Sequence, residues 1–248
     1  MPFRECTITL QDVVYQLGLP VDGHYVNGCL IDFHVYIQGA QPAWQWFQEL
    51  LGVLPPPSQI QKFVMNCTWF HETFGEFLDG TDEETVRHFA RAYIMILLGT
   101  QLFADKSGNR IHIRWLPYMA RLEEMGGYSW GLAALAWLYQ YMCRVANRHV
   151  VKLAGPLQLL QSWIFWRFPE FRPAGYDAFS WHLTSRWSGY NPSVSEKGPR
   201  VQMTRVRIDM LQARDHTRGH SACPSGGVGA ASYDLMAVCH VADIFCGG

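Results

Sequence analysis

The sequence lacks the short motifs that usually mark an enzyme. It contains no GxxxxGK[ST] loop and no GxGxxG turn, so nucleotide phosphates have no ready cradle. There is no GxSxG nucleophile elbow, and the ten histidines show no metal-ligand spacing. The sequence does not exclude a Ser/His/Asp catalytic triad, because the members of a triad can lie far apart in sequence, but no motif indicates one. The residues themselves therefore predict no catalytic site, no metal and no cofactor.

Lysine is also scarce, with four lysines among the 20 basic residues. A pyridoxal-phosphate enzyme needs a lysine for its Schiff base, and only Lys152, three residues before Gly155, lies in a suitable loop. The Ser/Gly phosphate loop and the aspartate partner of the pyridine ring are missing. Pyridoxal-phosphate catalysis is therefore the least favoured hypothesis.

Further absences bear on location and partners. The net charge is −1, so no global field recruits nucleic acid or anionic lipid. The apolar stretch at residues 130–143 is shorter than the ~20 residues that span a bilayer, and no apolar leader follows the N-terminus. The seven cysteines form no CxxC pair, as is typical of reduced intracellular thiols. We expect no membrane association, no secretion and no disulfide framework.

What the sequence does have is apolar side chains. Of its 248 residues, 49% are hydrophobic and 14% aromatic, which is ample for a large core. Residues 130–143 are apolar on nearly every face, and this pattern predicts a helix that is buried on every face. Ser129, just before it, is a natural N-cap. We take this stretch as the central helix of a helical domain.

Apolar spacing predicts a mainly α, multi-helical single domain with a small β-hairpin and short strands. A capping box from Thr9 to Asp12 begins the first helix, and Gly18 ends it. The Asp-Gly pair within residues 21–26 predicts a tight hairpin, and alternation over 111–115 predicts a short strand. Further amphipathic segments are expected at 42–54, 59–78, 86–98, 116–126, 156–168 and 204–213. We expect one domain over residues 1–215 and a poorly ordered, glycine-rich tail over 216–248.

The first helix also admits a DNA-reading interpretation. Its pattern, followed by Gly18, resembles the opening of a helix-turn-helix, whose second helix should begin about four residues later. Asp22, Gly23 and extended residues occupy that place instead. Packing is therefore the favoured interpretation.

Two charged features have competing explanations. Arg91 lies in an apolar helical run, so burial would require a partner such as Asp105 or Asp12; anion binding is the less favoured alternative. The acidic cluster at residues 79–84 could hold a metal, but a capping box from Thr81 to Glu84 explains it sufficiently. We expect structural roles for both features.

Basic residues gather near the end of the chain. Residues 197–218 hold six of them against two acids, and Arg205 and Arg207 lie at the centre of this stretch. Such a patch could contact nucleic-acid phosphates. A solvated helix face is the commoner explanation.

Four sequence blocks, in order over residues 3–172, resemble the plant mobile domain family, which is often called aminotransferase-like. The blocks are Glu5–Val13 with Leu17–Gly23, Ala90–Ile94 with Leu97–Gly99, Tyr128–Tyr139, and Gly155–Trp163 with Arg167–Pro169. The motif and core positions within them are Asp12, Gly18, Arg91, Trp130, Gly131, Trp163 and Arg167. Two departures from the family pattern suggest a truncated chain. The sequence begins only a few residues before the first block, and its Gly/Ala-rich end does not resemble the family.

The resemblance implies a transposon-derived plant protein. It implies that the protein acts in the nucleus, in transposon silencing, gene expression and meristem maintenance. It also implies a phosphatase-like protein as partner. No catalytic residues are implied. Our leading hypothesis is a non-enzymatic protein-interaction domain; a nucleic-acid-binding remnant of transposon machinery, in contact with DNA or chromatin, is the alternative.

Overall fold

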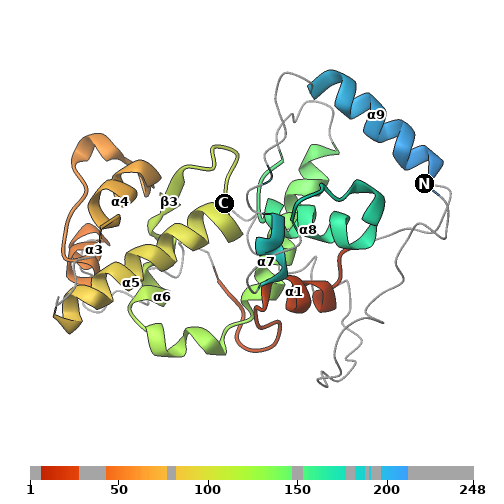
Figure 1. Ribbon diagram of the computed structural model, residues 1–248. Coiled ribbons are helices and arrows are strands. Elements are labelled where there is room, and N and C mark those ends of the chain that lie inside the picture. The colour runs from red at the N-terminus through yellow and green to blue at the C-terminus, as the bar shows by residue number, and fades with distance from the viewer. Residues whose placement is uncertain are drawn as a thin grey trace. The chain divides into compact units, whose positions relative to one another are not determined.

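The computed structural model describes residues 7–27, 43–76, 82–146, 153–176, 182–187, 190 and 197–211. These residues form two compact units. Unit 1 contains the described residues up to Leu19 and from Gln158 onward, and unit 2 contains those from Pro20 to Leu157. Both are mainly helical, and unit 2 also holds a small antiparallel sheet (Figure 1). The expected mainly α fold class with short strands is therefore confirmed.

Unit 1 consists of helices and 3-10 turns. They are α1 (Leu10–Leu17), α8 (Leu157–Arg167), η7 (Pro169–Phe171), η8 (Leu183–Trp187) and α9 (Lys197–Met210). The last helix was expected at 204–213, so it begins earlier than predicted. The expected tail, 216–248, lies outside the described residues.

The sequence signals at both ends of α1 are confirmed. The Thr9 hydroxyl accepts from the backbone N–H of Asp12, whose carboxylate accepts in return from the Thr9 N–H. Gly18 closes the helix in the left-handed conformation with φ of 67°. The sequence 20–27 is not helical, so the described chain contains no second helix of a helix-turn-helix at this place.

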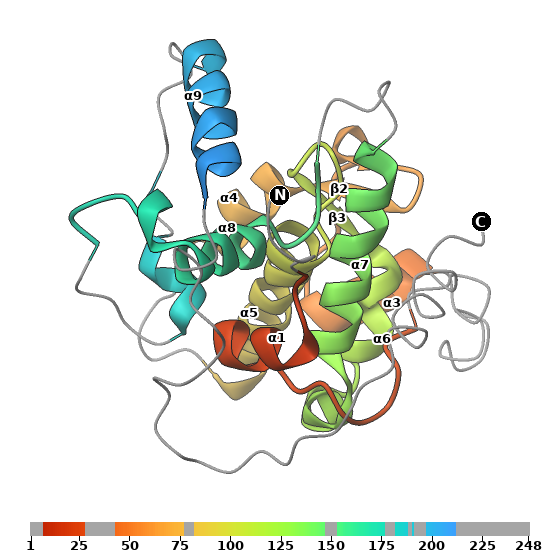
Figure 2. The same ribbon diagram turned by 90° about the vertical axis from the view of Figure 1, so that its right-hand side faces the viewer.

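Unit 1 is held together by a buried hydrogen bond and an aromatic core. Figure 2 shows helices α1 and α8 of this unit. The Ser162 hydroxyl on α8 donates to Oε1 of Gln16 on α1, and both residues are buried. The ring of Phe165 meets that of Trp187 edge to face, at 5.2 Å between centroids. α1 also packs against η8. Segments from the two ends of the chain thus form one core.

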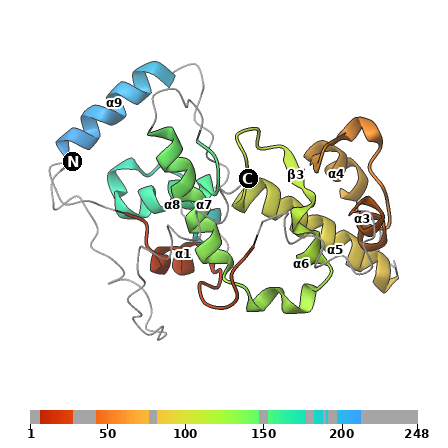
Figure 3. The same cartoon turned by 180° about the vertical axis from the view of Figure 1, so that it is seen from behind.

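Unit 2 begins with helices that pack around a long one. The elements in order are α3 (Ala43–Leu51), η3 (Pro57–Gln59), β1 (Ile60–Gln61), β2 (Val64–Asn66), α4 (Cys67–Phe74), α5 (Glu83–Leu97), the π-helical turn η4 (Leu98–Leu102), β3 (Arg110–His112), η5 (Ile113–Trp115), α6 (Leu116–Met119), η6 (Leu122–Gly127) and α7 (Trp130–Val145). Both α3 and α4 pack on α5 (Figure 3). Phe47, Phe70 and Phe74 join these helices through ring contacts.

The sheet has the order β1-β2-β3, antiparallel throughout. Ile60 pairs with Met65 and Met65 with Ile111, so the two buried side chains at 65 and 111 lie on one face. The amphipathic segment expected over 59–78 is therefore a hairpin followed by a helix. Lys62 turns the chain with φ of 59°, and Asn66 caps α4 by accepting from Thr68 N.

Three local predictions are wrong. No hairpin forms at residues 21–26, because His24 pairs in parallel with Tyr128 instead. The N-cap of α5 is Asp82 and not the predicted Thr81. The Asp82 carboxylate accepts hydrogen bonds from the backbone N–H and the hydroxyl of Thr85. The alternating segment 111–115 is strand only to His112, after which it tightens into η5.

The α7 helix is buried over most of its length. Every residue from Trp130 to Tyr141 is buried or half-buried, whereas Met142, Cys143 and Arg144 are exposed. Ser129 stands at the N-cap position, but its hydroxyl donates to the His24 carbonyl, so the expected side-chain cap does not form. No helix in the described part of the chain is both long and apolar enough to cross a membrane.

Candidate functional site

The predicted positions in unit 1 have structural contacts. Asp12 is buried, and its Oδ2 accepts from both the backbone N–H and the hydroxyl of Thr9, each at 2.8 Å. Trp163 is 8% exposed and meets the ring of Phe168 edge to face. Arg167 is the last residue of α8. With Gly18 at the end of α1, Asp12 and Trp163 thus stabilise the local fold.

Arg91 is hydrogen-bonded to main-chain carbonyls. Its Nε donates to Met119 O and its Nη1 to Leu50 O, both at 3.0 Å, so it ties α5 to α3 and α6. Burial, then the nearby charge of Arg87, lowers the pKa of this guanidinium. The expected ion pair with Asp12 or Asp105 does not form: the described ion pairs include no pair at Arg91. With two donors engaged by carbonyls, the geometry favours a structural role over anion binding.

Trp130 and Gly131 anchor the start of α7. The Trp130 indole N–H donates to Met125 O at 2.8 Å, and Gly131 N donates to Pro20 O at 2.8 Å. The Trp130 ring also lies 5.0 Å from that of Tyr118. The predicted positions are thus spread over both units.

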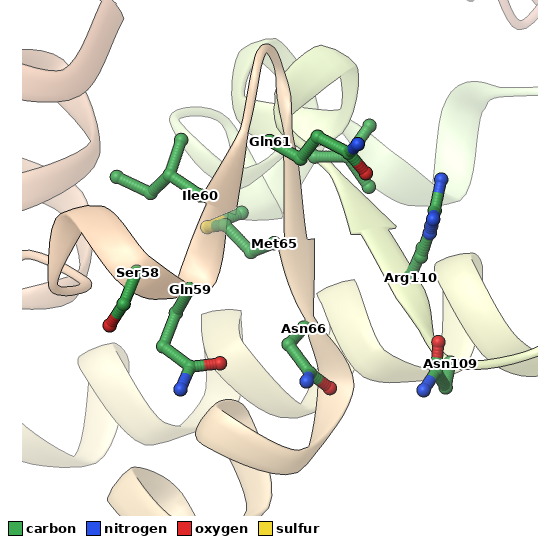
Figure 4. A pocket seen from close by; sticks show the side chains of 9 residues that line it. Ser58, Gln59, Ile60, Gln61, Met65, Asn66, Asn109 and Arg110 are labelled. Carbon is green, nitrogen blue, oxygen red and sulfur yellow. The ribbon is translucent and has the colours of Figure 1, made fainter.

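The larger of two described pockets, about 460 Å³, lies over η3 and the sheet (Figure 4). It is lined by Ser58, Gln59, Ile60, Gln61, Val64, Met65, Asn66, Asn109 and Arg110. Four of these side chains are carboxamides, and Arg110 is the one ionisable residue among these described lining residues. Carboxamides both donate and accept hydrogen bonds. The pocket can therefore bind a polar group, but its lining holds no carboxylate, histidine or cysteine, and the Ser58 hydroxyl has no base among these lining residues to activate it.

A second pocket, of about 220 Å³, adjoins the first and shares Val64 and Arg110 with it. Its lining also includes aromatic rings and the ionisable side chains of Asp105, His112 and Tyr141. Sequence reasoning missed it. The only signal was the polar alternation at residues 112 and 114, which indicated exposure rather than a pocket wall.

Two ionisable groups of this second pocket, His112 and Tyr141, are poorly suited to acid–base catalysis. Burial, and then the charge of Arg114, lowers the pKa of His112 to about 3, so the imidazole is neutral at pH 7. Its Nδ1 accepts from Arg114 N–H at 3.1 Å. Burial also raises the pKa of Tyr141. General catalysis works best with a pKa near the working pH, and both groups lie far from it.

Arginine side chains stack on tryptophan in unit 1. The Arg172 guanidinium lies 5.2 Å from the Trp166 ring, and Arg186 lies 5.5 Å from the same ring. Arg172 also donates to the carbonyls of Phe165 and Trp166 at the end of α8. Burial, followed by the charge of Arg186, lowers the Arg172 pKa. This cluster fixes the loops after α8.

The predicted nucleic-acid contacts both lie on α9 but have different surroundings. Arg205 is exposed. Arg207 is exposed too, but it stands 4.8 Å from the Phe171 ring centroid and donates to Glu170 O. Among the described side chains of the same helix, three large apolar ones are exposed: Met203, Val206 and Met210. Sequence reasoning noticed the charges of α9 and missed these apolar residues.

The acidic cluster offers no metal site within the described chain. Asp82 caps α5, and its hydrogen bonds with Thr85 lower the pKa of its carboxyl. No group of three or more His, Cys, Asp or Glu side chains suits a metal ion across the described ranges. Asp79 and Thr81, which the prediction also involved, lie outside those ranges, as does Lys152.

Comparison with known proteins gives a consistent family. A family model described as "Plant mobile domain" matches residues 1–218. Three similar proteins are from Arabidopsis thaliana. The "Serine/threonine-protein phosphatase 7 long form homolog" is 34% identical over 70% of this chain and 12% of its own length. "Protein MAIN-LIKE 1" is 32% identical over 76% of this chain and 36% of its own length. "Protein MAINTENANCE OF MERISTEMS" is 33% identical over 79% of this chain and 39% of its own length.

The chain thus spans at most 39% of these three relatives. No solved structure matches.

Proposed function

The chain belongs to the plant mobile domain family, and from this premise we propose that it is a non-enzymatic protein-interaction domain. It works in the nucleus, in transposon silencing, gene expression and meristem maintenance. Its partner is a phosphatase-like protein. The name of one relative, a meristem-maintenance protein, supports the meristem role, and the name of another, a phosphatase homolog, supports the choice of partner.

The observation that carries the interaction role is the apolar outer face of α9. Met203 and Met210 are 67% and 72% exposed, and Val206 is 56% exposed. Large apolar side chains that gather on one exposed face usually mark a protein contact. A surface that bound only phosphates would present cations in their place.

The pockets support a binding role over a catalytic one. The carboxamide pocket can hydrogen-bond a ligand, but its lining holds no carboxylate, histidine or cysteine. In the adjoining pocket, His112 stays neutral because its pKa is lowered to about 3. Neither lining combines an activated nucleophile with a base poised near neutral pH.

A direct titration tests this proposal. The probe is the part of the Arabidopsis phosphatase 7 long form homolog that lies outside its segment similar to this chain, and an unrelated Ser/Thr phosphatase serves as control. We expect calorimetry to show saturable binding of the probe alone. The partner assignment would be overturned if the probe and the control phosphatase bound equally well, or if neither bound. A fluorescent fusion in plant cells tests location, since exclusion from nuclei contradicts the nuclear role.

Nucleic-acid binding is the second candidate, favoured by one observation. The sequence of α9 holds four basic residues and one acidic residue, and Arg205 is exposed. A DNA-binding face would give an affinity that falls steeply with salt and weakens when Arg205 is replaced by alanine. Titration of the full chain with duplex DNA at two salt concentrations distinguishes this candidate from the first.

A further inference from the structure

Three exposed apolar side chains of α9 form a continuous seam. Met203, Val206 and Met210 are separated by three and then four positions, so they lie on one face of the helix. This a-d-a spacing is the one through which a helix packs against another helix. We call these three residues the α9 seam.

The contacts of α9 within unit 1 leave the seam facing outward. Thr204 and Ile208 are half-buried and lie on a different face of the helix from the seam, and Leu211, directly after the helix, is buried. The stacking of Arg207 on Phe171 fixes the rotation of α9 about its axis. Figures 1 and 3 show α9 at the outside of unit 1, apart from α1 and α8.

Two properties of α9 decide what can cover the seam. An apolar seam gives nucleic-acid phosphates nothing to pair with, so it argues against nucleic acid as the occupant. The helix carries four basic residues against one acidic residue, so a second copy of the same helix would meet like charge. The remaining occupant is a helix that is apolar on one face and acidic at its edges.

We propose that the α9 seam docks an acidic, amphipathic helix of a partner protein. This inference rests on the proposed interaction role and names the site and the chemistry of the partner. Methionine side chains at both ends of the seam adapt to the partner's apolar residues because they are flexible and unbranched. Arg207, at the edge of the seam, attracts an acidic residue flanking the partner's apolar face while it stays stacked on Phe171.

The test uses synthetic helical peptides and the full chain. One peptide has a leucine seam flanked by glutamates, and its control has lysines in place of the glutamates. We expect fluorescence anisotropy to show that the glutamate peptide binds at least tenfold tighter than the lysine peptide. The double variant Met203→Ser/Met210→Ser should weaken glutamate-peptide binding at least tenfold. The matched control Tyr93→Ser removes an equally exposed side chain, 62% exposed, from α5 and should change nothing.

Several outcomes overturn the proposal. They are equal binding of both peptides, full binding by the double variant, and seam-dependent binding of duplex DNA. Self-association in sedimentation that the double variant abolishes would make a second copy the occupant.

The two proposals fail separately. If the phosphatase probe binds the double variant as well as the wild type, the seam is wrong and the interaction role stands. If that probe does not bind at all but the peptide pattern holds, the phosphatase assignment fails and the seam stands.

Discussion

The guanidinium of Arg207 stands 4.8 Å from the centroid of the Phe171 ring and donates a hydrogen bond to the neighbouring carbonyl of Glu170. One residue of α9 thereby joins the helix to η7. Arg205, two positions earlier, points from a different face and is exposed. Arg205 and Arg207, two arginines of the same basic stretch, therefore have different surroundings.

This difference predicts different effects on stability. Arg207→Ala removes a cation–π contact and a hydrogen bond, and should lower the free energy of unfolding by about 1 kcal/mol. Arg205→Ala should change it by less than about 0.5 kcal/mol, as is usual for surface substitutions. Urea unfolding followed by tryptophan fluorescence measures both. Equal losses in the two variants would contradict the assigned packing of α9.

Arg91 should matter more than its neighbour Arg87. Arg91→Met leaves the carbonyls of Leu50 and Met119 without their donor, and hydrogen bonds from charged groups contribute about 1.5–3 kcal/mol. The control, Arg87→Met, removes an ion pair whose Arg87 and Glu83 side chains are 55% and 82% exposed, which is worth at most about 1 kcal/mol. Thermal unfolding should show a clearly larger loss for Arg91→Met. A smaller loss would mean that Arg91 does not hold α3 and α6.

His112 should make the protein less stable in acid. Its pKa is about 3 in the folded chain and about 6.5 when unfolded, so the unfolded state binds more protons between these values. Its contribution is fully present above pH 6.5 and is lost as the pH falls toward 3. The slope is at most about 1.4 kcal/mol per pH unit.

The matched variant is His112→Asn, which cannot titrate but keeps a side-chain acceptor for Arg114 N–H. Urea unfolding at pH 7.5, 6 and 5 should show a shallower decline in the variant than in the wild type. Parallel declines would show that His112 titrates normally in the folded protein.

Gly23 occupies a position that only glycine fits. Its φ is 115°, and a Cβ would lie 2.3 Å from the Gly127 carbonyl oxygen, which accepts from His24 N. Gly23→Ala should therefore destabilise the chain by more than about 1 kcal/mol. Gly108→Ala is a useful control, because its φ is also positive, at 69°, but no atom lies within 4 Å of the added Cβ. Equal melting temperatures for the two variants would contradict the described approach of residues 23 and 127.

Local signals in the sequence predicted local structure well. The capping box at Thr9 and Asp12 and the stop at Gly18 depend on neighbours within a few residues, so the chain shows them directly. The α7 helix was equally clear, since its apolar residues leave no polar face. The family blocks were recognisable because they combine several such signals in order.

Long-range contacts were not predictable in this way. Asp22-Gly23 is a common hairpin signal, but the adjacent His24 pairs with Tyr128, more than a hundred residues away. The acceptors of Arg91 are main-chain carbonyls, which carry no sequence signature. The α9 seam was also missed, because the charges of that helix suggested phosphate contacts. In the first two cases, tertiary packing supplied the partner.

The most direct test of the account is one titration of the phosphatase 7 long form homolog probe into two forms of the full chain, wild type and Met203→Ser/Met210→Ser. The account predicts saturable binding to the wild type and at least tenfold weaker binding to the double variant, with unchanged circular dichroism. Failure of the probe to bind the wild type, or equal affinity for both forms, would contradict it.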